Sequence, residues 1–152
     1  MSISLFSALY CIGQNELLPG EILQRGHILC FSNQYYLSMM QENGNLVTYI
    51  VVSLIITLND FLAEAKHILR FIIACLYTLQ GTREAIWESG TGNNAGYATV
   101  TETRFAICGK SGNILWWRDS SGKVDKLVLQ DSGTLVLMGT DGDVMWASTW
   151  DF

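Results

Sequence analysis

Apolar and polar residues alternate in short runs over most of the chain, and glycine-containing turns separate the runs. Four such turns contain the dipeptides Asn43-Gly44, Ser111-Gly112, Ser132-Gly133 and Asp141-Gly142. Asn-Gly, Asp-Gly and Ser-Gly pairs between alternating runs are typical of β-hairpins, because glycine tolerates the backbone angles of a tight turn. The spacing of these turns predicts an all-β domain.

Residues 50–79 follow a different pattern. Of these 30 residues 21 are apolar, and none is one of the chain's 14 glycines or five tryptophans. From Asp60 onwards the apolar residues recur every three or four positions, which predicts an amphipathic helix over about 60–79. The charge-free stretches that contain 46–58 and 71–80 are shorter than the ~20 residues that a membrane-spanning helix needs. We therefore expect a buried or partner-binding helix and no membrane span.

The chain contains an internal repeat. The stretch that ends at Trp146 resembles the one that ends at Trp116, 30 residues earlier, since each has a Gly-x-x-Gly turn and an apolar pair before the tryptophan. A third copy, ending at Trp87, emerges when residues 50–79 are left out. The sequence thus predicts three similar β units, the first of them interrupted by an insertion. We expect the three tryptophans to pack together on a pseudo-threefold axis.

The first unit carries a motif that resembles a known family. The runs from Gln41 to Tyr49 and from Ile86 to Thr91 are similar to the Q-x-D-x-N-x-V-x-Y and I-W-x-S-x-T signatures of the bulb-type (monocot) mannose-binding lectins. The resemblance covers nearly all of 1–49 and 80–152, so it implies a single lectin domain over 1–152. It also implies a β-prism II fold, with three pseudo-symmetric four-stranded sheets and one sugar site available per sheet.

The resemblance implies a mannose site in the first unit, made by Gln41, Asn43, Asn45, Val47 and Tyr49. These residue types suit a neutral hexose, because amides both donate and accept hydrogen bonds to hydroxyls and Val47 offers an apolar contact to ring carbons. The two-residue period of a strand places Asn45, Val47 and Tyr49 on one face. A two-residue turn at Asn43-Gly44 would put Gln41 on the opposite face. A convergent site therefore requires a wider turn or a bulge.

The match is incomplete in all three units. Asn43 stands where the family has Asp, and the loss of an anionic acceptor predicts a weakened site. Alignment of the second unit by its tryptophan places at the five site positions Val100, Glu102, Arg104, Ala106 and Cys108, none of which matches. The third unit has Gln130, Ser132, Thr134, Val136 and Met138, of which two match. We therefore expect one site, with the other two sheets acting as scaffold.

Composition and charge exclude several classes of function. A net charge of −5 lacks the basic surface that nucleic-acid binding needs. No motif of a hydrolase, a P-loop or a zinc protease is present, and His27 and His67 are isolated, so we expect neither catalysis, nor a cofactor, nor a bound metal. The cysteines at 11, 30, 75 and 108 form no CxxC pair, which favours reduced thiols.

Two functions remain open. The first is a lectin that binds mannose or mannose-containing glycans; the second is a lectin-derived interaction protein with a vestigial sugar site, in which residues 50–79 bind a partner or a membrane surface. Whether these residues derive from a retained intron or a functional insertion is also open. The N-terminal apolar stretch has no preceding basic residue, so no signal peptide is predicted and a cytoplasmic or unconventionally secreted protein is favoured. The family's exchange of C-terminal strands implies that residues 148–152 could support a homodimer.

Overall fold

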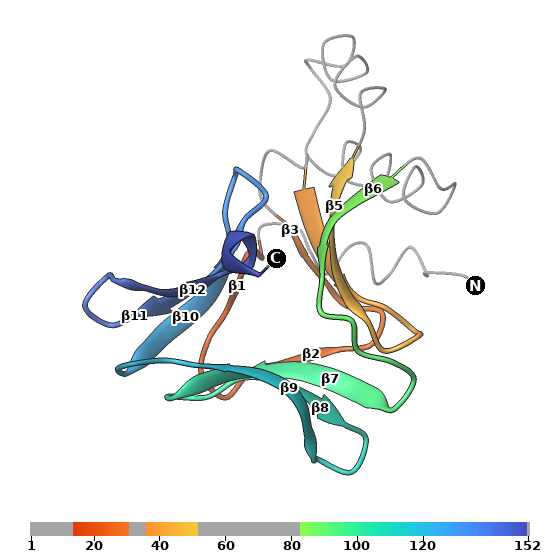
Figure 1. Cartoon of the computed structure of the whole chain (residues 1–152), viewed down its shortest axis with the longest axis horizontal. Coiled ribbons are helices and arrows are strands. Elements are labelled where there is room, and N and C mark those ends of the chain that lie inside the picture. Colours follow the sequence, from red (N-terminus) through yellow and green to blue (C-terminus); the bar gives the residue numbers. More distant parts are fainter. Residues whose placement is uncertain (1–13, 31–35, 52–82, 152) are drawn as a thin grey trace, which may run out of the picture.

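The structure is a computed structural model, and it describes residues 14–30, 36–51 and 83–151. Within these ranges, twelve strands form three four-stranded antiparallel sheets. Figure 1 shows the sheets arranged around a common centre, each occupying one side of the molecule. The expected all-β architecture with three four-stranded sheets is confirmed.

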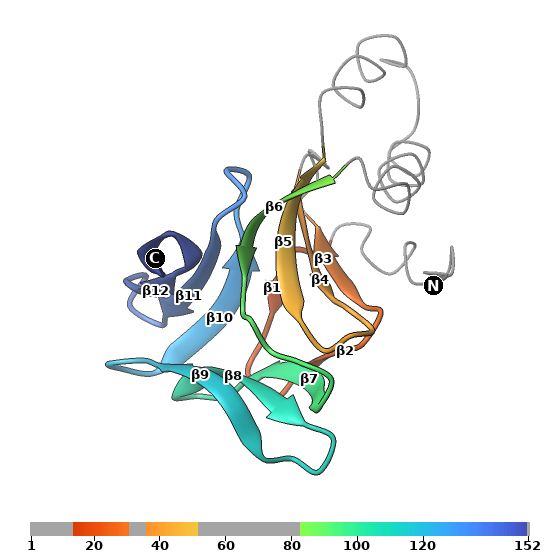
Figure 2. The same cartoon turned by 45° about the vertical axis from the view of Figure 1, so that its right-hand side comes forward.

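Each sheet combines three consecutive strands with one short strand from the N-terminal part of the chain (Figure 2). The first sheet contains β3 (Ile28–Cys30), β4 (Tyr36–Met40), β5 (Leu46–Val51) and β6 (Arg83–Glu88). The second contains β2 (Ile22–Gln24), β7 (Ala95–Val100), β8 (Arg104–Gly109) and β9 (Ile114–Asp119). The third contains β1 (Glu16–Leu17), β10 (Val124–Leu129), β11 (Leu135–Gly139) and β12 (Val144–Ala147). The N-terminal stretch thereby links all three sheets.

The strands that flank residues 52–82 are neighbours in the first sheet. Tyr49 of β5 pairs with Ala85 of β6, so the chain resumes the same sheet, as the repeat predicts. β5 continues to Val51, so the first two residues of the apolar stretch 50–79 belong to this strand. The helix expected over 60–79 lies outside the described residues, as does most of the segment on which the interaction-protein hypothesis depends. In the described ranges, no helix has the length and apolar character needed to cross a membrane.

The three repeat tryptophans meet at the centre of the molecule. The ring centroids of Trp87, Trp116 and Trp146 lie 5.6–5.8 Å apart in every pair, with edge-on geometry. Phe105 adds contacts to Trp116 at 5.1 Å and to Trp146 at 5.7 Å. Edge-to-face pairs at this separation are favourable, because the positive edge of one ring meets the negative face of another. The predicted packing of the three tryptophans is confirmed, with Trp146 buried and Trp87 and Trp116 partly buried against the core.

Each sheet also repeats the same irregularity. In the first, second and third sheets the register between the two last strands shifts just before the tryptophan, so that one residue of the apolar pair has no partner. These extra residues are Ile86, Leu115 and Met145. An extra residue in one strand redirects the side chain that follows it, and here it directs the tryptophan to the core. The pseudo-symmetry therefore includes the bulge as well as the strands.

The cysteines depart from expectation. Cys108 is free and buried, but Cys30 is disulfide-bonded, so the expectation of reduced thiols is wrong for Cys30. The spacing along the chain could not reveal this bond, because a disulfide requires two cysteines to meet in the folded protein. Cys11 and Cys75 lie outside the described residues.

The C-terminal residues fold back onto the chain's own core. Ser148–Trp150 form a short 3-10 helix, and the Asp151 carboxylate that follows accepts a hydrogen bond from Trp146 Nε1 at 3.2 Å. The same carboxylate forms an ion pair with Arg118 at 3.1 Å, and this guanidinium lies 4.3 Å from the centroid of the Trp116 ring. Exchange of the tail between two copies would require these contacts to break.

Candidate functional site

The hairpin turn between β4 and β5 brings four of the predicted site residues to one face. Gln41 N donates to Asn45 O at 2.9 Å, and Gly44 N donates to Gln41 O at 3.0 Å. The turn therefore contains residues 42–44, one more than a two-residue hairpin, and Gln41 lies opposite Asn45. With Val47 and Tyr49 at the next alternate positions, all four lie on the face directed away from the tryptophan core. The wider turn that a convergent site requires is present.

This face has a buried half and an accessible half. Gln41, Val47 and Tyr49 are only 8%, 2% and 7% exposed, and Gln41 Nε2 donates to the Tyr49 hydroxyl. Asn43 is exposed and Asn45 is half-buried. The solvent-facing groups of the predicted site are therefore the two asparagines at its turn end.

The Asn45 side chain is held by contacts on both of its polar atoms. Its Oδ1 accepts from Ser89 Oγ and from Gly90 N, each at 3.0 Å, and its Nδ2 donates to Glu88 Oε2 at 2.8 Å. Asn43 Oδ1 accepts from Asn45 N at 3.0 Å and stabilises the turn. These hydrogen bonds thus fix the orientation of the Asn45 amide.

Glu88 belongs to the candidate site, although the sequence analysis did not predict it. It pairs with Val47 across β5 and β6, and its carboxylate is exposed beside Asn45. Glu88 occupies a variable position of the I-W-x-S-x-T pattern, so the motif does not identify it as a candidate binding residue. The two-residue strand period does place it on the opposite face from Trp87, which is the signal that could have identified it.

The I-W-x-S-x-T run, residues 86–91, connects the β4–β5 turn to the loop that follows β6 through hydrogen bonds. Ser89 Oγ accepts from Leu46 N at 3.1 Å, and Thr91 Oγ1 donates to Gly44 O at 2.5 Å. Gly44 has φ +84°, and a Cβ at this position would overlap the Gly92 carbonyl oxygen. Glycine is therefore required both by the backbone angle and by the close approach of the loop.

Arg25 stabilises the same region through hydrogen bonds to three backbone carbonyls. Its guanidinium donates to the carbonyl oxygens of Glu42 at 2.6 Å and Asn93 at 2.5 Å, and its Nε donates to Ala95 O at 2.8 Å. Because these carbonyls belong to the β4–β5 turn, to the loop before β7 and to the first residue of β7, one side chain fixes the two segments relative to each other. No local sequence pattern indicates this role.

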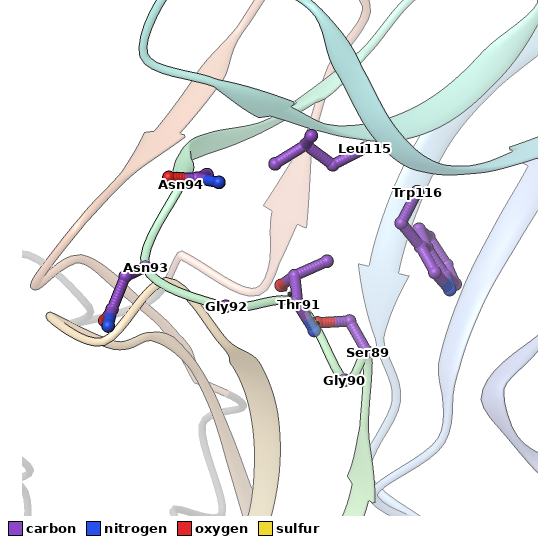
Figure 3. Close-up of a pocket in the computed structure, with 8 residues that line it drawn as sticks. All are labelled: Ser89, Gly90, Thr91, Gly92, Asn93, Asn94, Leu115 and Trp116. Atoms are coloured by element: carbon purple, nitrogen blue, oxygen red, sulfur yellow. Dashed lines mark hydrogen bonds between the residues drawn. The ribbon is translucent and has the colours of Figure 1, made fainter.

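A cavity of about 350 Å³ (Figure 3) is lined in part by Ser89 and Gly90, the two residues that donate hydrogen bonds to Asn45 Oδ1. Its lining consists of Ser89, Gly90, Thr91, Gly92, Asn93, Asn94, Leu115 and Trp116. In Figure 3 the side chains of Asn94 and Leu115 extend toward each other across the cavity, while the Trp116 ring points away toward the core. Among the described residues, the wall contains hydroxyl and amide groups and no charged side chain.

The second sheet does not reproduce the first site. Thr101 N donates to Arg104 O at 2.8 Å, so its turn is shorter by one residue. Thr101, and not Val100, therefore occupies the position of Gln41, which corrects the alignment by the tryptophan at this point. Cys108 occupies the position of Tyr49 and lies opposite Tyr97 of β7. The pKa of the Tyr97 phenol is raised, mainly by the charge interaction with Cys108 and to a smaller extent by a hydrogen bond to Cys108 and by burial.

The third sheet has the same turn geometry as the first but different side chains. Gln130 N donates to Thr134 O at 2.9 Å and Gly133 N to Gln130 O at 3.0 Å. Thr134 stands at the position of Asn45, and its hydroxyl accepts from Ser132 at 3.1 Å. Met138 replaces Tyr49, so this face has neither the paired amides nor the phenol. In the part of the chain that the structure describes, no three His, Cys, Asp or Glu residues gather to hold a metal ion.

Comparison with known proteins places this architecture among solved lectins. Monomeric monocot mannose-binding lectins from Gastrodia elata match with a TM-score of 0.61 and 20% identity, over 89% of this chain and 96% of theirs. The lectin of Polygonatum cyrtonema, complexed with monomannoside, matches with a TM-score of 0.56 and 22% identity, over 88% of this chain and 94% of that one. The mannose-specific agglutinin of snowdrop (Galanthus nivalis), complexed with methyl-α-D-mannoside, matches with a TM-score of 0.56 and 20% identity, over 84% and 92%.

Sequence comparison adds nothing to this result. No protein-family model matches the chain, and no curated protein is significantly similar to it. The similarity to the solved lectins therefore resides in the arrangement of the sheets, and the chain has their β-prism II fold.

Proposed function

We propose that this protein is a carbohydrate-binding lectin that recognises mannose or mannose-containing glycans through the outer face of its first sheet. The observation that carries the proposal is the three-residue turn, which places Gln41 opposite Asn45 and on the same face as Val47 and Tyr49. Amide, phenol and apolar groups then converge within one hairpin. This combination suits the hydroxyls and CH patches of a neutral hexose.

The structural relatives support mannose as the sugar. Two of them, the snowdrop and Polygonatum cyrtonema lectins, were solved with bound mannosides in the same fold. In this chain the accessible end of the face offers a sugar Asn43, Asn45 and Glu88 as hydrogen-bonding partners. Contact with Val47, which is 2% exposed, requires the inner half of the face to become accessible.

Glu88 supplies the anionic acceptor that the Asn43 position lacks. Its exposed carboxylate hydrogen-bonds Asn45 Nδ2 and has lone pairs left for a sugar hydroxyl. Hydrogen bonds to ionised acceptors are about twice as strong as neutral ones. The lectin thus keeps one charged acceptor at the turn end of the site, and this acceptor is supplied by β6 instead of by the β4–β5 turn.

Asn45→Ala is expected to abolish retention of the protein on mannose-agarose. The change removes both polar atoms of the Asn45 amide from the accessible end of the site and releases Glu88 and Ser89, at a cost of about tenfold or more in affinity. The matched control is Thr134→Ala, the equivalent position of the third sheet, which should be retained like the wild type and eluted by free methyl α-mannoside. Failure of the wild type to bind, or retention of folded Asn45→Ala, contradicts the proposal.

Glu88→Gln is expected to weaken mannose binding about three- to tenfold in titration calorimetry, because the shape is kept while the charged acceptor becomes neutral. Glu84→Gln serves as control. Glu84 is an exposed carboxylate on the same strand as Glu88, but it lies opposite Ile50 and not beside Asn45. Equal affinities for wild type and both variants would show that Glu88 takes no part in sugar binding.

A further inference from the structure

We propose that a groove between the first and second sheets binds the next sugar unit of a glycan whose terminal mannose occupies the first-sheet site. This inference rests on the proposed function and extends it to a ligand of at least two linked neutral sugars. The groove, called here the inter-sheet groove, comprises two adjoining cavities of about 350 and 340 Å³ that share Asn93, Asn94 and Leu115. Each volume is within the range of small-molecule sites, about 300–1,000 Å³.

The lining of the inter-sheet groove has the chemistry that a neutral sugar needs. Neither polar atom of the Asn94 amide is hydrogen-bonded within the described part of the chain. Asn113 uses its Oδ1 to accept from Ser111 Oγ at 2.8 Å, which leaves its NH₂ group available. Leu115 is 37% exposed and presents an apolar surface between these amides. Amides that donate and accept, set beside an apolar patch, match the hydroxyls and CH face of a pyranose.

The charge of the groove argues against an anionic ligand. Of the described residues that line either cavity, Lys110 alone is charged. A single exposed ammonium on a flexible stem is a weak anchor, whereas sites for carboxylate or phosphate gather several fixed donors. The Asn and Ser side chains outnumber it and are of both donor and acceptor type. The ligand class indicated is therefore a neutral saccharide.

The groove is held rigid on both sides. On one wall, Arg25 binds the Asn93 and Ala95 carbonyls and Ala95 N donates to Gly92 O at 2.9 Å. On the other, the β8–β9 turn is closed by Gly109 N donating to Asn113 O at 2.7 Å. Lys110 N donates to Asn94 O at 3.3 Å and joins the two walls. A preformed site loses little entropy on binding, which favours a ligand such as a neutral sugar that is held by several individually weak hydrogen bonds.

The groove lies beside the first-sheet site. Ser89 Oγ donates to Asn45 Oδ1 at 3.0 Å and also lines the groove, so a single side chain separates the two. Thr91, the next lining hydroxyl, contacts Ser89 at 2.9 Å. A glycosidic link that passes over Ser89 and Gly90 would thus connect a sugar at Asn45 with one beside Asn94.

The test compares a monosaccharide with an oligosaccharide on the full chain. Titration calorimetry is performed with methyl α-mannoside and with a linear α-linked mannotriose, using the wild type, Asn94→Ala and the control Thr140→Ala. Thr140 is exposed in the β11–β12 turn of the third sheet, which corresponds to the β8–β9 turn of the groove, and Asn94 is exposed in the loop before β7, so both variants should keep the wild-type melting temperature. We expect mannotriose to bind the wild type more tightly than methyl α-mannoside, and Asn94→Ala to lose about three- to tenfold of the mannotriose affinity only.

The outcomes separate the groove from the first-sheet site. If methyl α-mannoside binds but mannotriose is no tighter and Asn94→Ala has no effect, the groove inference is overturned while the proposed function stands. If methyl α-mannoside does not bind, the proposed function fails. The NMR resonances of the Asn94 and Asn113 side-chain NH₂ groups then show whether the groove binds a sugar by itself. Their shift on addition of mannotriose supports a sugar site there, and unchanged resonances overturn it.

Discussion

Replacing Trp116 by alanine is expected to lower the free energy of unfolding by about 3–5 kcal/mol, the usual cost of removing a large aromatic side chain from a core. The ring is in edge-on contact with Trp87 at 5.8 Å, with Trp146 at 5.8 Å and with Phe105 at 5.1 Å. It therefore joins all three sheets. Its loss also removes the surface on which the Arg118 guanidinium lies, 4.3 Å from the ring centroid. Urea denaturation followed by circular dichroism measures the change.

The adjacent Trp117 provides a matched control for this experiment. It follows Trp116 in β9, points to the opposite face and is 49% exposed. Trp117→Ala removes the same side chain from the surface, so the expected loss is less than about 1 kcal/mol. If the two variants are equally stable, the tryptophan core does not hold the three sheets together.

Gly44→Ala is expected to destabilise the protein by about 2–4 kcal/mol, through two effects that act together. The residue has φ +84°, where a side chain is strained, and its Cβ would overlap the Gly92 carbonyl oxygen. Relief of that overlap would separate the β4–β5 turn from the loop after β6 and break the Thr91–Gly44 hydrogen bond. Mannose binding should fall as well, because Asn45 is held by the same loop.

Gly142→Ala isolates the conformational part of this effect. Gly142 has φ +83° in the β11–β12 turn, and a Cβ there meets nothing within 4 Å. The expected loss is therefore about 1 kcal/mol, the cost of the left-handed backbone alone. A loss for Gly44→Ala no larger than that for Gly142→Ala, in the same denaturation assay, would mean that the contact with Gly92 is not tight.

The contrast between Asn45 and Glu88 shows why only part of the candidate site could be read from the chain. Asn45 belongs to a run of alternate residues within one hairpin, and a strand period is a local property that the sequence displays directly. Glu88 lies 43 residues further along and meets Asn45 only because β6 pairs with β5. Arg25 is further still, 70 residues from the Ala95 carbonyl it binds. Such contacts depend on the register of whole sheets.

The width of the β4–β5 turn is a second case. Asn43-Gly44 is compatible with a two-residue hairpin, which would have separated Gln41 from the rest of the site. In the structure, Arg25 binds the Glu42 carbonyl and Thr91 binds the Gly44 carbonyl, and these contacts accompany the three-residue form. The second sheet, with a shorter turn between Thr101 and Arg104, shows that the repeat alone does not determine turn length.

The sequence by itself determined the all-β class, the three repeated units and the central tryptophans. The hydrophobic period, the turn residues and the recurring tryptophan are features of short stretches of sequence, so they can be recognised without knowledge of the fold. Only the tertiary structure decided which segments meet. It placed Glu88 beside Asn45, buried Val47 and Tyr49, put Cys30 in a disulfide and formed the inter-sheet groove from two loops. The physical reason is that burial, strand register and contacts between loops arise from the packing of three sheets at once. No single stretch of sequence contains that information.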